Sequence, residues 1–260
     1  MLLMGAGLMI NSFLRLQNVD LGFDRKNLLT AEIHLDGRKY WYNLGGDIKR
    51  VTPQADIFFE QLLERVRQLP GVVSASIGSL EGMIPNPVRI AGRPPEDVSE
   101  QFQPLYAEVS PGYFTTMGIP VLKGRALSER DVLEVPWVVV VSESFARRLF
   151  PDEDPIGKTL QMAISSFGAN LDIEEGRPRE IVGVVRDVKY WGPRNQPPHV
   201  LYGSFRQHPW DYPGGSKFIH LMTRVVIRTV GDPMSLAAPL QRIVAELDKF
   251  IIGQDRAKRA

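Results

Sequence analysis

Alternating apolar and polar residues predict strands near both ends of this chain. The stretch 28–35 (LLTAEIHL) has an apolar residue at every second position from Leu29 to Leu35. The stretches 72–77 and 219–229 (IHLMTRVVIRT) alternate in the same way. Because a period of two is typical of strands that bury one face, we expect all three stretches to lie in a sheet that is covered on one side.

Apolar residues at helical spacing predict one helix after the first strand and another after the last. Each helix begins with a capping residue followed by proline, Thr52-Pro53 in the first and Asp232-Pro233 in the second. The first helix is expected to end at Pro70-Gly71. Since Pro239 lies inside the second apolar stripe, we expect a kink or a loosened first turn there.

The order of these elements predicts two β-α-β units that share one sheet in an α+β fold. The first unit covers residues 28–80 and contains a polar loop at 36–52, and the second covers residues 218–255. The sequence FIIG at 250–253 would begin the closing strand of the second unit.

The middle of the chain, residues 84–205, has short apolar runs separated by loops rich in proline and glycine. This pattern predicts a β-rich subdomain inserted between the two units. It includes one short helix at 142–150, which Ser142 caps and Pro151 follows. The predicted strands of this subdomain are 105–109, 137–141 and 180–188.

The chain opens with MLLMGAGLMI, which carries no charge and no side-chain hydrogen-bonding group. No basic residue precedes Leu2, which argues against a secretory signal. Residues 1–14 supply about two-thirds of the roughly 20 apolar residues that a membrane helix needs. We therefore expect residues 1–16 to be the truncated end of a transmembrane helix, and a buried or amphipathic helix is the alternative.

Charge and cysteine content exclude several classes of function. Lys and Arg total 31 and Asp and Glu total 30, so no basic field favours a nucleic-acid partner. The sequence has no cysteine, which excludes disulfides, cysteine-ligated metals and thiol catalysis.

Short motifs that suggest chemistry are incomplete. Gly157-Lys158-Thr159 lacks the glycine that a phosphate-binding loop requires five residues earlier, where Asp152 stands. The acidic run PDEDP at 151–155 lacks the glycine of a calcium loop. No Gly-x-Ser-x-Gly is present, and no pair of histidines has the spacing i, i+4. We therefore expect no catalytic residue, no cofactor and no metal site.

The block SPGYFTTMGIPVLKGR at 110–125 is interpreted as a determinant of the fold. Pro111-Gly112 predicts a turn, and Gly118 and Gly124 permit tight backbone.

Six blocks of the sequence occur in the same order as in one known family. They are GFDRKNLLTAEIHL, FFEQLLERVRQLPGVVSASIGSL, YAEVSPGYFTTMGIPVLKGRALSERD, VVVVSESFARRLFPDEDPIGKTL, EIVGVVRDVKYWG and VVIRTVGDPMSLAAPLQRIVAELD. Together they resemble the MacB-like periplasmic core domain of FtsX-like ABC transporter permeases, and in particular the acidobacterial-type permease subfamily.

The resemblance implies a porter-like part made from the two ends of the chain and an inserted sabre-like part. It places the domain on the periplasmic side of the bacterial inner membrane. The implied function is mechanotransmission in export or envelope processes: the domain, not itself an enzyme, would couple ATP-driven motion of membrane helices to conformational change outside. The alternative is a periplasmic module that binds or senses a lipid, a peptide or an envelope protein.

The resemblance also implies partners. These are the permease's own or neighbouring transmembrane helices, a separate cytoplasmic ABC ATPase, a second copy or paired repeat of the domain, and a periplasmic adaptor protein. Two loops, 81–103 and 189–217, carry apolar and aromatic residues among prolines, which is typical of contact surfaces. Packing beneath their own loops is the alternative. The candidate contact residues are Met83, Ile84, Trp191, Trp210 and Tyr212.

Overall fold

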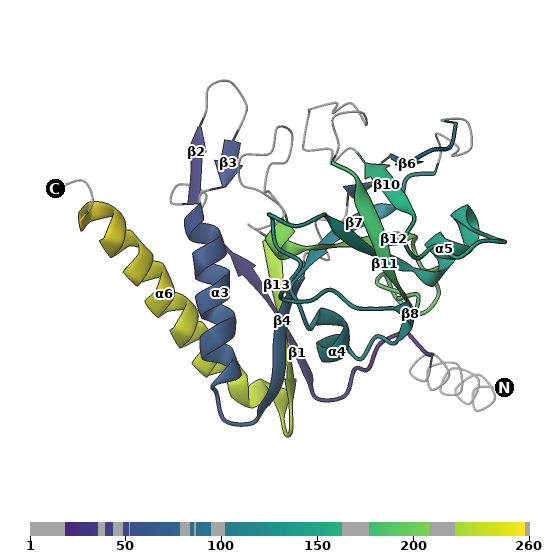
Figure 1. Ribbon diagram of the computed structural model, residues 1–260. Coiled ribbons are helices and arrows are strands. Elements are labelled where there is room, and N and C mark those ends of the chain that lie inside the picture. Colours follow the sequence, from purple (N-terminus) through teal and green to yellow (C-terminus); the bar gives the residue numbers. More distant parts are fainter. Residues whose placement is uncertain are drawn as a thin grey trace, which may run out of the picture.

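The computed structural model describes residues 19–35, 40–43, 49–51, 53–78, 84–85, 87–94, 102–162, 177–207 and 222–257. Side chains are described throughout these ranges except at 41–43, 49–51, 53, 84, 222 and 250–257. Eleven of the described strands form one mixed sheet in the order β1-β13-β4-β7-β12-β9-β11-β10-β6, with β5 beside β7 and β8 beside β11 (Figure 1). The mixed α+β class expected from the sequence is confirmed.

One end of the sheet is built from the two ends of the chain. Strands β1 (Leu28–His34), β13 (Met222–Thr229) and β4 (Val72–Gly78) lie side by side and are antiparallel. Helices α3 (Pro53–Arg67) and α6 (Ala237–Ala257) both lie on one side of these strands (Figure 1). The core between the two layers includes Ile33, Phe58, Phe59, Leu62, Ile77, Val225, Ile227, Leu240 and Leu247.

This arrangement is a split β-α-β unit, because β13 lies between β1 and β4 in the sheet. A second crossover begins with β13 and continues through a 3-10 turn, Pro233–Leu236, into α6. The expected loosening near Pro239 takes the form of this turn, which Asp232 caps by accepting a hydrogen bond from the backbone N–H of Met234 at 3.0 Å.

Two predictions for this end of the sheet are wrong. Residues 250–253 are helical, because α6 continues to Ala257 and the short apolar run FIIG does not by itself distinguish a strand from a helix. The region 36–52, expected to be a loop, contains the hairpin strands β2 (Trp41–Asn43) and β3 (Lys49–Val51). The predicted membrane helix at 1–16 lies outside the described residues.

The rest of the sheet comes from the middle of the chain. The predicted strands and helix at 105–109, 137–141, 142–150 and 180–188 are found with shifts at their ends, and Ser142 caps the helix as expected. The elements are β5 (Ile84–Pro85), β6 (Val88–Ile90), β7 (Leu105–Val109), α4 (Tyr113–Met117), β8 (Val121–Gly124), β9 (Val138–Ser142), α5 (Glu143–Leu149), β10 (Thr159–Met162), β11 (Arg179–Val185), β12 (Val200–Ser204) and the 3-10 turn Phe205–Gln207.

The two regions of the sheet meet at a narrow junction between β4 and β7. In the strand register only Gly78 and Val109 are paired across it. The junction is reinforced just beyond β7, where Ser110 donates its backbone N–H to the carbonyl of Ile77 and its Oγ accepts the N–H of Ile77, both at 3.0 Å. The sheet is therefore continuous between the regions, although few residues join them.

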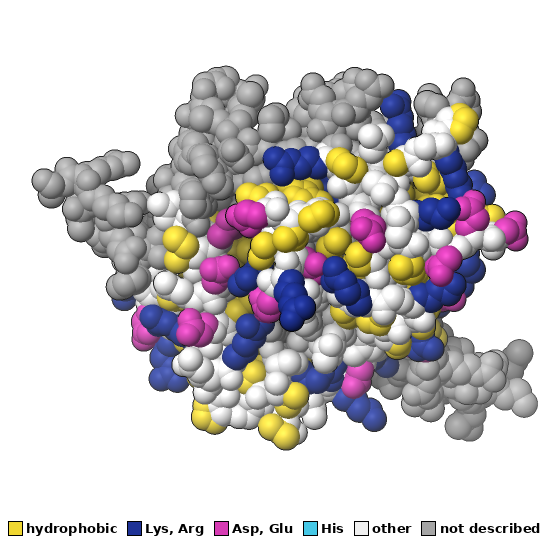
Figure 2. Space-filling model, in the orientation of Figure 1, with side chains coloured by type: hydrophobic (Ala, Val, Ile, Leu, Met, Phe, Trp, Pro, Cys, Tyr) yellow, Lys and Arg dark blue, Asp and Glu magenta, His cyan; other side chains and the backbone are white. Residues whose placement is uncertain are grey.

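The surface facing the viewer in Figure 2 has positive and negative side chains interspersed, in agreement with the nearly balanced charge of the sequence. Within the ranges that the structure describes, no helix has both the length and the apolar character required to span a membrane.

Candidate functional site: the clamp on the lead-in segment

Residues 19–27, here called the lead-in segment, connect the predicted membrane-helix region to β1. In Figure 1 this segment passes beneath α4 and reaches the foot of β1. Their contacts decide which parts of the fold the segment joins.

Arg228 of β13 holds the lead-in segment against α4. Its Nε donates to the carbonyl of Thr116 at 2.8 Å, and its Nη2 donates to the carbonyl of Asp24 at 2.9 Å. Its Nη1 donates to the carbonyl of Lys26 at 2.7 Å and to the Asp24 carboxylate at 3.2 Å. Only 16% of the Arg228 side chain is exposed. A planar guanidinium with several donors in fixed directions can make such a set of bonds, whereas an ammonium cannot.

The contacts of residues 20–27 with β13, α4 and the turn after β11 are here called the clamp. Backbone hydrogen bonds add to those of Arg228 on the side of the clamp that faces β13 and α4. The N–H of Asp24 donates to the carbonyl of Met117 at 3.0 Å, and the N–H of Thr229 donates to the carbonyl of Asn27 at 2.9 Å. Gly118, which ends α4 at a φ of +67°, lies so close that a Cβ on it would be 2.8 Å from the Cβ of Asp24. The close approach explains why glycine ends this helix.

The other side of the clamp is formed by the turn that follows β11. The N–H of Lys189 donates to the carbonyl of Leu21 at 3.0 Å, and Arg186 pairs with Asp20 at 3.2 Å. Gly22 has a φ of +85°, and a Cβ on it would lie 2.0 Å from the carbonyl oxygen of Asp187. The lead-in segment therefore contacts both the end of the sheet formed by β1, β13 and β4, through β13, and the part from the middle of the chain, through α4 and the turn after β11.

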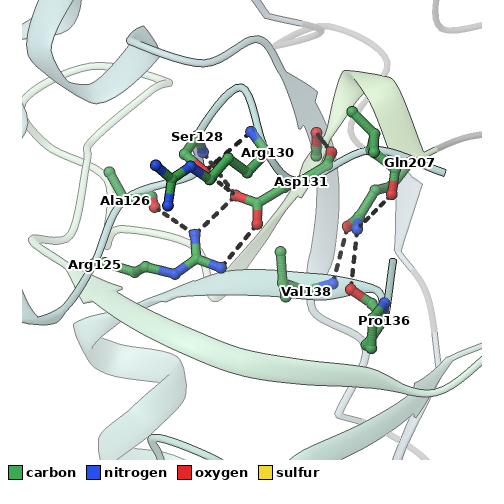
Figure 3. Close-up of polar contacts among 10 residues, drawn as sticks. Arg125, Ala126, Ser128, Arg130, Asp131, Pro136, Val138 and Gln207 are labelled. Atoms are coloured by element: carbon green, nitrogen blue, oxygen red, sulfur yellow. Dashed lines mark hydrogen bonds and ion pairs between the residues drawn. The ribbon is translucent and has the colours of Figure 1, made fainter. Parts of the chain in front are cut away.

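A second polar cluster fixes the loop between β8 and β9 (Figure 3). The Asp131 carboxylate accepts two hydrogen bonds from Arg125, both at 2.8 Å, and one from the N–H of Ser128 at 2.7 Å. Gln207 donates to the carbonyls of Val132 and Pro136 at 3.1 Å, and its Oε1 accepts the N–H of Val138 at 2.9 Å. Each of these side chains bonds to another group of the same loop or to a residue next to it, so the cluster is structural.

Asp131 makes this loop sensitive to acid. Burial raises the pKa of the Asp131 carboxyl, but hydrogen bonds and charge from Arg125 and Ser128 outweigh it, so the pKa is lowered. The resulting stabilisation is fully present above the pKa of aspartate in the unfolded chain, about 3.9, and it is lost as the pH falls through the lowered pKa.

We expect Asp131→Asn to lower the free energy of unfolding at pH 7 by about 2 kcal/mol, and the variant should lose less stability than the wild type on acidification. Urea unfolding at several pH values measures this, with the exposed Asp152→Asn as the control. Equal acid sensitivity in Asp131→Asn and the wild type would contradict it.

Ser144, Asp187 and His199 form the one grouping among the described residues that suggests catalysis. His199 Nδ1 lies 3.1 Å from Ser144 Oγ. However, Asp187 accepts the backbone N–H of Ser144 at 2.8 Å and pairs with Arg147 at 3.2 Å. Asp187 makes no hydrogen bond to the imidazole of His199, which it influences only through its charge. A hydrolytic triad requires the acid to orient the histidine, so this grouping is better explained as support for the N-terminus of α5.

His199 predicts a second pH effect. Burial lowers the pKa of the imidazole, and the opposing charge of Asp187 does not cancel this. The folded state therefore favours the neutral ring, and stability is lost as the pH falls below the ordinary value of about 6.5 towards the lowered pKa. We expect His199→Gln to flatten the stability profile in that window. Thermal unfolding between about pH 7 and 5 measures the slope, and an unchanged slope would refute the assignment.

The remaining chemical motifs have structural partners. Lys158 of the Gly-Lys-Thr sequence pairs with Glu153 at 2.6 Å, and Gly157 donates its N–H to the carbonyl of Ile181 at 2.9 Å. His34 pairs with Glu32 at 2.8 Å. Within the described part of the chain, no group of three histidine or acidic side chains could hold a metal ion.

The candidate contact residues are only partly described. Trp191 is 58% exposed, on the turn after β11. Ile84 pairs through its backbone with Tyr106, and its side chain is not among those described. Met83, Trp210 and Tyr212 lie outside the described residues, so the contact role of this set stays a prediction.

Fold and clamp together define a class: an α+β domain built on one mixed sheet, in which the segment before the first strand is held against β13, α4 and the turn after β11. The chain matches the family model described as the MacB-like periplasmic core domain over residues 9–228, and it belongs to that family.

Solved structures of similar fold include the periplasmic region of MacB from Actinobacillus actinomycetemcomitans. That match has 17% identity and a TM-score of 0.51, and it covers 88% of this chain and 86% of the other. The extracellular domain of the noncanonic ABC-type transporter YknZ from Gram-positive bacteria matches with 14% identity and a TM-score of 0.50, covering 86% of this chain and 95% of the other. These likenesses concern the fold.

Curated relatives include the macrolide export ATP-binding/permease protein MacB of Aggregatibacter actinomycetemcomitans. It is 30% identical over 151 residues, which are 56% of this chain and 21% of that protein. The protein of the same name from Neisseria gonorrhoeae is 32% identical over 74 residues, which are 28% of this chain and 10% of that protein. The chain thus matches about a fifth or less of the length of these relatives.

Sequence reasoning did not find the clamp. Gly22 and Arg228 each lie within a block of the family resemblance, but they are 206 residues apart in sequence. The available signal in the sequence was the glycine at position 22, because glycine is the usual residue where the backbone has a positive φ or passes close to another segment.

Proposed function

We propose that this chain is the extracytoplasmic domain of a bacterial ABC transporter permease and transmits motion of the membrane helices to the periplasmic side. Residues 1–16 would be the end of the first membrane helix. Residues 28–80 and 218–255 would form the porter-like part, and residues 84–205 the inserted sabre-like part. This chain would carry out no covalent chemistry, and a separate cytoplasmic ATPase would hydrolyse ATP.

The clamp on the lead-in segment is the observation that supports this function most directly. Arg228 joins the segment to β13, and Lys189 joins it to the turn after β11. Because packed interiors transmit strain rather than absorb it, a pull on residue 19 would reach both regions of the sheet at once.

The same proposal extends to partners and location. The domain would stand on the periplasmic face of the inner membrane, next to its own permease helices and paired with a second copy or repeat. Macrolide export is named for the relatives and is a property of those proteins. The contacts of the clamp do not indicate which molecule a permease containing this chain would transport.

Single-molecule pulling tests whether the lead-in segment carries force into the whole domain. Because the sequence has no cysteine, Val19→Cys and Lys249→Cys give unique attachment points for handles in the full chain. We expect one cooperative unfolding event in which the lead-in segment detaches together with the sheet. If the lead-in segment peels away at a lower force and the sheet remains folded, the mechanical role is refuted.

A further inference from the structure

Exposed apolar side chains gather at the end of the sheet where the lead-in segment enters it. Val230, Met234 and Val73 are the three most exposed large hydrophobic residues in the described part of the chain, at 73%, 64% and 60%. Val73 lies at the start of β4, Val230 follows β13, and Met234 lies in the 3-10 turn before α6. Single exposed apolar residues are ordinary on a protein surface, but a group of them marks an interaction site. The segments that carry them, residues 71–73 and 230–234, are here called the apolar turns.

The apolar turns are joined to each other and held in position. Val230 donates its N–H to the carbonyl of Gly71 at 2.9 Å, and Thr229 Oγ1 donates to the carbonyl of Gly231 at 2.7 Å. A Cβ on Gly71 or on Gly231 would meet no heavy atom within 4 Å, so both turns have open space around them. The apolar side chains are therefore held towards the exterior and do not fold back on the core.

The apolar turns lie on the side of the domain that the lead-in segment occupies. Asn27, the last residue of that segment, accepts the N–H of Thr229, which directly precedes Val230, at 2.9 Å. Figure 1 shows this end of β4 and β13 as the lowest part of the sheet, and the lead-in segment runs along the same underside. The proposed function places residues 1–16 in the membrane, and residues 17–27 span at most about 40 Å even when extended. The apolar turns would therefore lie near the bilayer surface, on the side that faces it.

Positive charge is in excess around the apolar turns. The charged residues within 24–27, 67–73 and 228–234 are the basic residues Arg25, Lys26, Arg67 and Arg228 and the acidic residues Asp24 and Asp232. Arg25 and Lys26 are exposed, whereas Asp24 is paired with Arg228. The Asp232 carboxylate accepts the N–H of Met234. Basic residues beside exposed apolar ones are typical of surfaces that bind anionic lipid, since the apolar groups enter the interface and the cations meet the phosphates.

A bilayer fits the apolar turns better than a protein partner does. A stable protein interface buries about 800 Å² on each partner. Here the exposed apolar groups are three side chains on two narrow turns, which is too little for such an interface. A bilayer requires no complementary shape, because its interface accepts an apolar group that reaches the boundary between headgroups and acyl chains.

We propose that the apolar turns are a lipid-contact site. Val230, Met234 and Val73 enter the headgroup region of the bilayer, and Arg25 and Lys26 meet the phosphates of anionic lipids. The site rests on the proposed function, which supplies the position of the membrane, and it adds a second point of contact besides the predicted membrane helix. Such a contact holds one end of the sheet at the bilayer surface.

Lipid quenching of labels on single cysteines tests the site directly, because the sequence has no native cysteine. Val230→Cys and Met234→Cys are each labelled with an environment-sensitive fluorophore in the full chain. The chain is reconstituted in vesicles of phosphatidylglycerol and phosphatidylcholine that carry nitroxide-labelled lipid, and the bound fraction is isolated by flotation. We expect quenching at both positions. Ile57→Cys is the matched control and should not be quenched, because Ile57 is an exposed apolar residue near the far end of α3.

Two substitutions at exposed positions separate the apolar and the electrostatic contributions. With the label at residue 230, Met234→Glu should reduce quenching by about half or more, because a carboxylate does not enter the acyl boundary. Ile57→Glu makes the same change at the far end of α3 and should leave quenching unchanged. Lys26→Glu should reduce quenching in the vesicles that contain phosphatidylglycerol and have little effect in phosphatidylcholine alone.

The outcomes separate this site from the proposed function. If the chain floats with the vesicles but neither label is quenched, or if Ile57→Cys is quenched equally, the lipid-contact site is overturned and the proposed function stands. If the chain does not float, the membrane location in the proposed function fails, and the lipid contact fails with it. A blue shift of the labels that grows with protein concentration in the absence of lipid would also overturn the site, because a second copy would then cover the turns.

Discussion

Arg228→Met is expected to lower the free energy of unfolding by about 3 kcal/mol. The substitution keeps a long side chain in β13 but removes every hydrogen bond from the guanidinium to Thr116, Asp24 and Lys26. Hydrogen bonds to charged groups contribute more than neutral ones, and here one side chain satisfies three carbonyl oxygens of two different segments. The lead-in segment should therefore loosen from α4 as the protein loses stability.

Urea unfolding of the full chain measures this loss. Arg228→Lys keeps the charge without the planar fork, so we expect an intermediate loss. Arg130→Met is the matched control, because Arg130 is exposed and a change there should stay within about 0.5 kcal/mol. If Arg228→Met is as stable as the control, the side chain does not hold the clamp.

Gly22→Ala should be the second large effect, at about 3 kcal/mol. Two costs add at this position. The φ of +85° strains any residue with a Cβ, and the new methyl would lie 2.0 Å from the Asp187 carbonyl oxygen. The lead-in segment would have to move away from the turn after β11, which would also break the bond between Lys189 and Leu21.

Gly71→Ala separates the two costs. Gly71 has a φ of +82°, but no heavy atom lies within 4 Å of the added Cβ. This control should lose about 1 kcal/mol from backbone strain alone. Thermal unfolding of both variants gives the difference, which is the cost of the close approach. Equal losses in the two variants would mean that the lead-in segment is not held against Asp187.

Local pattern predicted the end of the sheet formed by β1, β13 and β4 because its signals lie within single elements. The alternation from Leu29 to Leu35 correctly indicated which face of β1 packs against the helices. The apolar stripe from Phe58 onward likewise indicated which face of α3 packs against the sheet. These periodicities follow directly from strand and helix geometry. The capping of α5 by Ser142 was equally local.

The prediction that was wrong at 250–253, and the contacts that were not predicted, depend on residues outside the segment concerned. The run at 250–253 is too short to set a period, and whether it is strand or helix depends on the rest of α6. The contacts of Arg228 with Asp24 and of Gly22 with Asp187 appear only once β13, the turn after β11 and the lead-in segment are placed together. No periodicity of a single segment encodes such contacts.

Native-state hydrogen exchange at the two ends of the clamp tests the central claim most directly. The amides of Asp24 and Lys189 bond across the clamp to Met117 and Leu21. If the lead-in segment is part of the same cooperative unit as the sheet, both amides should exchange with an opening free energy equal to that of core amides such as Val226 in β13. Exchange of Asp24 and Lys189 through a low-energy local opening, while Val226 stays protected, would contradict the account.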